Sequence, residues 1–254
     1  MNQFASYSKY YDTIYGEKDY RKEVSFIKKL WRLFGKGATR SVLSLGCGTG
    51  QHELLLAQEG FGVVGVDRSP QMIRLAKARF KETGEKIELH CKDITRVHLR
   101  KKFDAVTALF NIIGYMNSDE ELERFFSVAS THLKRGGTLI FDGWYQPAVL
   151  KRPPANKKLA VVGEQGEKIV RHTTQTLDTQ KSILNILFTL RITERGGNTS
   201  VITERHPMRF FTYRELARAA HAHGLEIVNT SLPFKEKAPI SDDYWNMWVV
   251  MKKC

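Results

Sequence analysis

Long hydrophobic runs are missing from this chain of 254 residues. No segment approaches the roughly 20 apolar residues of a membrane-spanning helix, and the opening residues, MNQFASYSKYYD, lack the apolar stretch of a secretory signal. We therefore expect a soluble, cytoplasmic protein with no membrane partner. Hydrophobic residues still make up 42% of the chain, enough for a sizeable core, which excludes disorder for most of it.

Cysteine is also scarce. Cys47, Cys91 and Cys254 are too few and too irregularly spaced for a disulfide framework or a thiolate metal site, so we expect reduced thiols. The histidines form no ligand set either. His221 and His223 are two residues apart in a predicted helix, which places their rings on different faces. We predict no metal site.

Acidic residues are outnumbered, with 27 Asp and Glu against 40 Lys and Arg, a formal charge of +13. The excess is uneven. Residues 1–40 carry nine basic and four acidic residues and residues 144–211 carry eleven and five, whereas residues 41–143 are nearly balanced with fourteen and thirteen. A basic surface indicates nucleic acid, an anionic membrane or a phosphate-bearing small molecule as partner.

Residues 41–143 alternate between short apolar runs and amphipathic segments. Strands are predicted at SVLSL, FGVVGVD, IELHCKDI, FDAVTALFNII and GTLIFDGW. Helices are predicted over residues 51–58, from Pro70 to near Gly84 after an N-cap at Ser69, and through Lys134 after a capping box of Ser118 and Glu121. This alternation predicts an α/β fold with a doubly wound, mostly parallel sheet.

The pattern changes after Tyr145. Four β-branched runs separated by GEQGE, DTQK and RGGN predict an antiparallel meander. A helix then follows a capping box of Thr212 and Glu215, and two final strands are expected at the edge of the parallel sheet. We divide the chain into an N-terminal helical cap (1–40), a Rossmann-like core (41–143), an antiparallel β insertion (144–211) and a C-terminal helix with strands (212–254).

The first strand runs into a glycine loop. Gly46, Gly48 and Gly50 alternate there, and Asp67 ends the second strand. Glycines let a ligand approach the backbone at a helix N-terminus, and an acid at the end of the second strand can accept both ribose hydroxyls. The G-x-G-x-G spacing lacks the third glycine position of the dinucleotide fingerprint, so a pyrophosphate cradle is not favoured.

LSLGCGTG with Asp67, and then Asp93-Ile94 after the third strand, resembles the cofactor site of class I S-adenosylmethionine-dependent methyltransferases. The resemblance implies a seven-stranded core, S-adenosylmethionine as cofactor and S-adenosylhomocysteine as product. It implies that the glycine loop passes the methionine moiety, that Asp67 holds the ribose, and that Asp93 contacts the adenine amino group. The implied cofactor-binding residues are Tyr15, Gly46, Cys47, Gly48, Asp67, Arg68, Met72, Asp93, Ile94, Phe110 and Asn111.

Two observations disfavour a nucleic-acid substrate. Base methyltransferases acting on amino groups place (Asn or Asp)-Pro-Pro-aromatic at the end of the fourth strand, where this chain reads Asn111-Ile112-Ile113-Gly114. Pyrimidine C5 chemistry needs an activated cysteine, and neither Cys47 nor Cys91 is well placed. An RNA methyltransferase that uses the basic segments remains an alternative.

A second resemblance covers most of the chain. SKYYDTIYGEKDYRKE, LFNIIGYMNSDEEL, RGGTLIFDGWYQP and HPMRFFTYRELARAAHAHGL are similar to N,N-dimethyltransferases of nucleotide-linked amino sugars. This resemblance implies that the aromatic N-terminal segment closes over the cofactor, and that the insertion helps to form the substrate pocket and the interface of a homodimer.

These features favour methylation of the amine of a small, anionic, nucleotide-linked substrate. Tyr11, Tyr15 and Tyr115 are the catalytic candidates that line the methyl-transfer site, while His172 and His206 are candidates for proton acceptance. The candidate substrate residues are Tyr11, Trp144, Tyr145, His172 and His206. The sequence is also compatible with O-methylation of a small metabolite, and with a protein that binds S-adenosylmethionine without catalysing methyl transfer.

Overall fold

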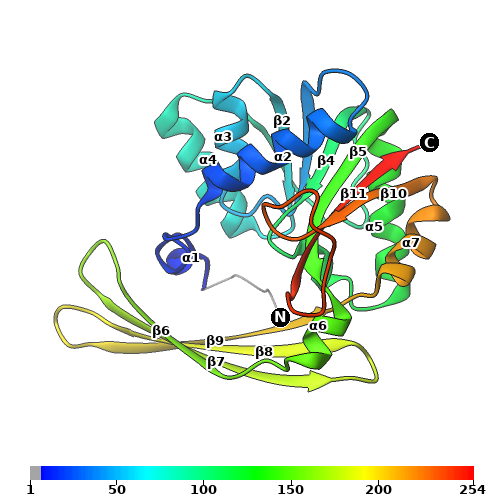
Figure 1. Cartoon of the computed structure of the whole chain (residues 1–254). Helices are drawn as coiled ribbons and strands as arrows, with labels where there is room; N and C mark the ends of the chain where they lie inside the picture. The colour runs from blue at the N-terminus through cyan, green and yellow to red at the C-terminus, as the bar shows by residue number, and fades with distance from the viewer. Residues whose placement is uncertain (1–6) are drawn as a thin grey trace.

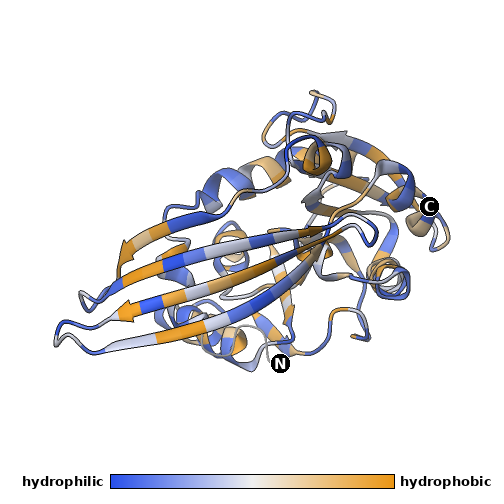
Figure 2. Cartoon of the chain, turned by 90° about the horizontal axis from the view of Figure 1, so that it is seen from below, coloured by the Kyte–Doolittle hydropathy of each residue, from blue (hydrophilic) through white to orange (hydrophobic). Residues whose placement is uncertain are grey.

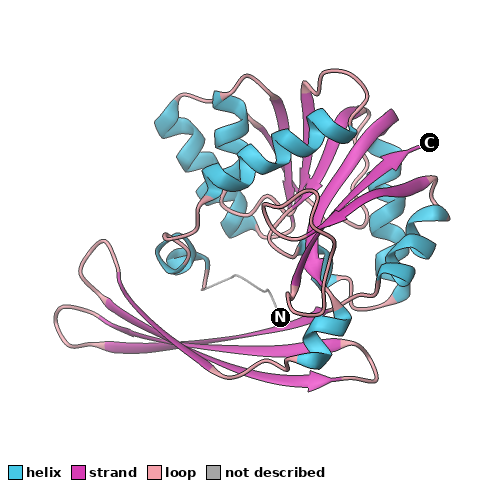
Figure 3. Cartoon of the chain, in the orientation of Figure 1, coloured by secondary structure: helices cyan, strands magenta, loops and turns pink. Residues whose placement is uncertain are grey.

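The computed structural model describes residues 7–254 and contains two β-sheets (Figure 1). A seven-stranded sheet with helices on both faces forms the upper part of the view, and a four-stranded antiparallel sheet lies below it (Figure 3). The strands of the larger sheet are β1 (Ser41–Leu45), β2 (Gly62–Asp67), β3 (Glu88–Cys91), β4 (Phe103–Ala108), β5 (Leu133–Trp144), β10 (Leu225–Ser231) and β11 (Asn246–Lys253). The smaller sheet contains β6 (Lys157–Val162), β7 (Lys168–Asp178), β8 (Ile183–Thr193) and β9 (Thr199–Arg209). The helices are α1 (Ser8–Ile14), α2 (Tyr20–Phe34), α3 (Gln51–Gln58), α4 (Pro70–Thr83), the 3₁₀ helix η1 (Ile112–Tyr115), α5 (Asp119–His132), α6 (Gln146–Lys151) and α7 (Tyr213–His221).

The larger sheet has the strand order β10-β11-β5-β4-β1-β2-β3, in which β1 to β5 are parallel. β11 pairs antiparallel with both β5 and β10 at one edge. This confirms the predicted doubly wound sheet of seven strands. The strand order reverses between β1 and β4, and such a switch point is where ligands bind in open α/β sheets.

Local sequence explains most of the helix ends. The Ser69 side chain accepts the Met72 N–H ahead of Pro70, and Thr212 and Glu215 form the predicted capping box of α7. The box predicted for α5 is only half formed. Ser118 accepts the N–H of Glu121, but the Glu121 carboxylate accepts the N–H of Asn117 and not that of Ser118.

Two predicted boundaries differ from the structure. α5 ends at His132 and not near Lys134, and residues 135–137, expected to stop the helix, lie within β5, which begins at Leu133. β4 ends at Ala108, whereas the apolar run predicted a strand through Ile113. The run leaves the sheet because Phe110 and Asn111 adopt positive φ angles of 67° and 55°, after which η1 begins.

Helices cover the two faces of the larger sheet with separate apolar clusters. α2 buries Val24, Ile27, Leu30 and Trp31 against one face, and α5 and α7 pack on the other. Within the predicted N-terminal cap, α2 is therefore part of the helical layer, whereas α1 lies beside the smaller sheet (Figure 1). Residues 1–6 of the cap lie outside the described residues.

We call β6–β9 the insertion sheet. Residues directly opposite one another in an antiparallel pair share a face. Ile169, Ile186, Leu190 and Ile192 are therefore on the buried face, which we call the inner face, and their neighbours in sequence are on the outer face. Hydrophilic and hydrophobic residues accordingly alternate along these strands (Figure 2). Among residues 7–254, none of the helices is long and apolar enough to cross a membrane.

Candidate active site

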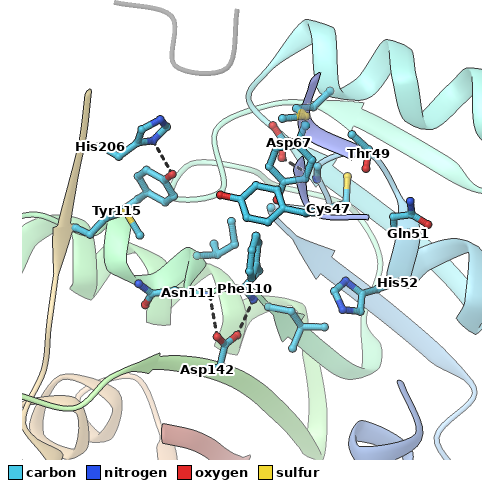
Figure 4. A pocket seen from close by; sticks show the side chains of 18 of the residues that line it. Cys47, Thr49, Gln51, His52, Asp67, Phe110, Asn111, Tyr115, Asp142 and His206 are labelled. Carbon is cyan, nitrogen blue, oxygen red and sulfur yellow. Dashed lines mark hydrogen bonds between the residues drawn. The ribbon is translucent and has the colours of Figure 1, made fainter. Parts of the chain in front are cut away.

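A cavity lies where the exits of β1, β4 and β5 meet α1 and the inner face of the insertion sheet (Figure 4). The cofactor loop and the ends of the parallel strands form one side, and residues of α1, β8 and β9 form the other. The lining residues are Tyr7, Tyr11, Tyr15, Tyr20, Gly46, Cys47, Gly48, Thr49, Gln51, His52, Asp67, Met72, Leu109, Phe110, Asn111, Ile112, Tyr115, Asp142, Trp144, Ile186, Phe188, His206, Met208 and Asn246.

Two glycines shape the loop after β1. Gly46 has a φ of +79°, and a Cβ there would lie 2.5 Å from Cδ1 of Ile112, so a larger residue fits neither the backbone nor the packing. Gly48 has a φ of +55°, and a Cβ there would meet no heavy atom of the described residues within 4 Å. The loop therefore presents bare backbone to the cavity at Gly48.

Asp67, at the end of β2, is fixed by backbone donors. Its Oδ2 accepts the N–H of Gly48 at 2.9 Å and its Oδ1 accepts the N–H of Ser69 at 2.8 Å. Burial raises the pKa of Asp67 above its usual value, while these two hydrogen bonds oppose the increase. The carboxylate is thus held beside the glycine loop.

The exit of β4 is a strained turn held by another carboxylate. Asp142 of β5 accepts the N–H of Phe110 at 2.6 Å and the N–H of Asn111 at 3.0 Å (Figure 4). Both donors have positive φ, which costs a non-glycine residue on the order of 1 kcal/mol or more. Burial raises the pKa of Asp142 to about 6.

The amide of Asn111 is buried within this turn. The side chain is 7% exposed, and among residues 7–254 neither Nδ2 nor Oδ1 has a hydrogen-bond partner. Buried amides in native proteins are rarely left without partners. This amide lies at the cavity, where a bound molecule can provide both partners.

Tyrosines within α1 and at its two ends form an aromatic wall of the cavity. Tyr7 and Tyr15 both accept hydrogen bonds from Nη1 of Arg171, at 2.9 and 3.1 Å, and the Tyr11 and Tyr15 rings are 4.8 Å apart. Burial raises the pKa of Tyr7 and of Tyr11 well above the usual value for a phenol. These hydroxyls are therefore protonated at neutral pH.

A third polar group joins η1 to the insertion sheet. Tyr115 Oη lies 2.9 Å from Nδ1 of His206, and Nε2 of the same histidine lies 3.3 Å from the carboxylate of Glu204. Glu204 also accepts the backbone N–H of Tyr7 at 3.2 Å. His206 and Glu204 are 2% and 9% exposed, so the group is screened from solvent.

The structure brings most of the sequence-predicted site residues to one cavity. Those that line it are Tyr11, Tyr15, Gly46, Cys47, Gly48, Asp67, Met72, Phe110, Asn111, Tyr115, Trp144 and His206. Five others are not among the lining residues: Arg68, Asp93, Ile94, Tyr145 and His172.

These five lie in different surroundings. The Arg68 guanidinium is 5.7 Å from the centre of the ring of Tyr115, which lines the cavity. Asp93 accepts hydrogen bonds from the backbone and hydroxyl of Thr95, Ile94 packs on the core cluster, and Tyr145 packs there as well. His172 is exposed on the outer face, so it cannot accept a proton from a molecule in this cavity.

Sequence reasoning missed several lining residues, above all Tyr7, His52, Asp142 and Phe188. Asp142 ends the apolar run of β5, a position that could have marked it. Phe188 belongs to the inner-face alternation of β8. That alternation could have found it only if the face turned toward the cofactor loop had been known.

Comparisons with known proteins agree with this geometry. A model of the methyltransferase domain matches residues 42–137. The cypemycin N-terminal methyltransferase of Streptomyces sp is 30% identical over 189 residues, which cover 74% of this chain and 73% of that protein. The dTDP-3-amino-3,4,6-trideoxy-α-D-glucopyranose N,N-dimethyltransferase of Streptomyces venezuelae is 27% identical over 210 residues, which cover 83% of this chain and 85% of that protein.

Structural comparison agrees at the level of the fold. The crystal structure of Streptomyces venezuelae DesVI superimposes with a TM-score of 0.81 at 22% identity, covering 98% of this chain and 99% of that one. The chain belongs to the class I S-adenosylmethionine-dependent methyltransferases. It is accordingly an enzyme with S-adenosylmethionine as cofactor.

Proposed function

We propose that the enzyme transfers methyl groups to the amine of a small molecule, and that this molecule is an amino sugar carried on a nucleotide. The observation that carries the proposal is the position of the cavity, because the insertion sheet and α1 leave room for a small acceptor beside the cofactor loop. Similarity to an amino-sugar N,N-dimethyltransferase, extending over 83% of this chain, supports the same substrate class.

The residues present fit S-adenosylmethionine. Bare backbone at Gly48 and the adjoining carboxylate of Asp67 would hold the methionine moiety and the ribose. The amide of Asn111, which has no hydrogen-bond partner within residues 7–254, lies at the same cavity. When bound, this cofactor supplies a methyl group activated on a sulfonium. Met72 and Phe110 would contribute apolar contacts to it.

The protein's contribution to the reaction is mainly positioning. Holding an amine in line with the methyl group can supply up to roughly 7 to 11 kcal/mol of the barrier reduction. Tyr11, Tyr15 and Trp144 form aromatic walls for the acceptor, and Arg171 on the inner face is a cation that suits an anionic substrate. An amine attacks only in its neutral form, so a positioned group that accepts its proton would assist the reaction.

Product analysis tests the proposal. The purified enzyme is incubated with methyl-labelled S-adenosylmethionine and, separately, with nucleotide-linked amino sugars, their hydroxyl counterparts, a peptide with a free amino terminus, and RNA. Mass spectrometry should show one or two methyl groups on the amino sugars. Label on the hydroxyl compounds alone would indicate O-methylation, and label on RNA alone would contradict the substrate class.

A further inference from the structure

We propose that Glu204, His206 and Tyr115 form a relay that removes the proton from the acceptor amine, with Tyr115 and His206 as catalytic residues and Glu204 as a positioning residue. The inference rests on the proposed function, since only an amine substrate enters the cavity as an ammonium ion that must be deprotonated.

The geometry of the three residues supports a relay. Tyr115 Oη lies at the cavity, 2.9 Å from Nδ1 of His206 (Figure 4). Nε2 of His206 lies 3.3 Å from the Glu204 carboxylate. Nδ1 can accept the phenolic proton only when the other ring nitrogen, Nε2, carries the imidazole hydrogen. The Glu204 carboxylate, an acceptor only, favours that tautomer because it faces Nε2.

The relay is held in place from several elements. Glu204 and His206 are two residues apart on β9, so both point to the inner face. The Phe188 ring lies 5.1 Å from the imidazole and the Tyr7 ring 6.5 Å from it, which restricts rotation of His206. The other Glu204 oxygen accepts the Tyr7 N–H, which fixes the carboxylate in turn.

The carboxylates of Asp67 and Asp142, which also line the cavity, already accept hydrogen bonds from the backbone. Both oxygens of Asp142 accept backbone N–H groups at the β4 exit, and both oxygens of Asp67 do the same beside the glycine loop. Tyr115 alone is not a base, because burial raises its pKa well above the usual value. It can pass a proton only if its own proton leaves to His206 in the same step.

An N–H bond of the acceptor ammonium breaks and its electron pair stays on nitrogen, while the proton goes to Tyr115 Oη. The proton of Tyr115 moves to Nδ1 of His206, and the resulting imidazolium faces the Glu204 carboxylate. The neutral amine would then accept the methyl group that the cofactor supplies, with S-adenosylhomocysteine as the leaving group. After the product leaves, Nδ1 of His206 returns its proton to Tyr115 Oη while Tyr115 passes its own proton to water that enters the cavity.

Two acceptors that differ in basicity separate a relay from a structural role. The first is a dTDP-linked 3-amino sugar, which is largely protonated at neutral pH. The second is the same sugar with an aminooxy group, which is weakly basic and enters neutral. Steady-state kinetics are measured for the wild type and for His206→Gln, Tyr115→Phe and Glu204→Gln, with Thr203→Val on the outer face of the same strand as control.

For the amine, we expect His206→Gln and Tyr115→Phe to lower kcat by about 100-fold, the lower end of the range for general acid–base catalysis. Glu204→Gln, which keeps an acceptor for the Tyr7 N–H, should cause a smaller loss. For the aminooxy sugar, all three losses should stay below about threefold, because no proton has to leave before attack. KM, S-adenosylmethionine affinity and the Thr203→Val enzyme should be unchanged.

Equal losses with both acceptors, while the wild type is active, would overturn the relay and leave the proposed function standing. A wild-type enzyme that methylates neither acceptor would overturn the proposed function and the relay with it.

Discussion

At the scale of single residues, Asp67 is the side chain expected to bind the ribose of the cofactor. Its carboxylate is aligned by the N–H groups of Gly48 and Ser69, at the end of a strand that borders the cavity. A hydrogen bond between a charged group and its partner contributes roughly 1.5 to 3 kcal/mol. Loss of the ribose contact should therefore be visible in cofactor affinity.

We expect Asp67→Ala to weaken S-adenosylmethionine binding by about tenfold to a hundredfold. Isothermal titration calorimetry measures the affinity directly. Asp104→Asn is the matched control, since it alters an aspartate at the opposite end of the parallel strands, where Asp104 binds Ser41. Unchanged affinity in Asp67→Ala, or an equal loss in the control, would contradict the assignment.

Asp104 should make the stability of the folded protein depend on pH in the acidic range. Burial opposes its ionisation, but hydrogen bonds from Lys134, Arg40 and Ser41 outweigh burial and lower its pKa to about 2. A pKa lowered in the folded state adds stability above the unfolded value of 3.8, and this stability is lost as the pH falls toward 2.

Urea unfolding at two pH values tests this expectation. Asp104→Asn should lower the free energy of unfolding by about 2 kcal/mol at pH 7 and by about half as much at pH 3. Asp242→Asn, at an exposed ion pair with Lys151, should change neither value appreciably. A deficit in Asp104→Asn that does not shrink on acidification would show that the lost stability is not electrostatic.

At the scale of elements, α1 connects the two sheets. Tyr7 and Tyr15, at its two ends, accept hydrogen bonds from Arg171 of the insertion sheet. Asp12 accepts hydrogen bonds from Thr49 and Arg79, each at 2.8 Å, beside the cofactor loop. A helix of seven residues has little stability alone. These contacts therefore determine how firmly α1 covers the cavity.

We expect Asp12→Ala to weaken S-adenosylmethionine binding by about fivefold, because a partly exposed ion pair and one hydrogen bond together contribute about 1 kcal/mol. Amide hydrogen exchange over residues 8–14 should accelerate at the same time. Asp19→Ala, which removes the N-cap of α2 but no contact of α1, should change neither quantity. Faster exchange without weaker binding would mean that the contacts holding α1 do not contribute to S-adenosylmethionine affinity.

At the scale of the whole molecule, the basic charge of the insertion falls mainly on the face away from the cavity. Strand register places five basic residues on the outer face: Lys158, Lys168, Arg191, Arg205 and Arg209. On the inner face, the basic residues of these strands are Lys157 and Arg171. The net charge of residues 144–211 therefore overstates the positive charge that faces a substrate.

Adjacent lysines provide a matched test of this division. Lys157→Glu on the inner face should raise KM for a nucleotide-linked acceptor several-fold, while Lys158→Glu on the outer face should leave it nearly unchanged. S-adenosylmethionine affinity should be the same in both variants. Equal increases in KM would indicate that the general field of the protein attracts the substrate, whichever face carries the charge.

Much of the larger sheet could be predicted from sequence because its determinants are local. Short apolar runs, the cap at Ser69 and the capping box at Thr212 each act within a few residues, and each specifies the same element in the structure. The prediction was wrong at the exit of β4. There the backbone is turned by hydrogen bonds to Asp142, about thirty residues later, which overrides the β propensity of residues 109–113.

The sequence by itself determined the methyltransferase fold and the glycine loop with Asp67, since glycine geometry and strand periodicity are properties of neighbouring residues. Tertiary structure alone decided which face of the insertion sheet meets the cavity, and so placed His206 inside and His172 outside. It also brought Tyr115 to His206 across 91 residues. Alternation divides a strand into two faces, but only the packing of one sheet against the rest of the chain decides which face is buried.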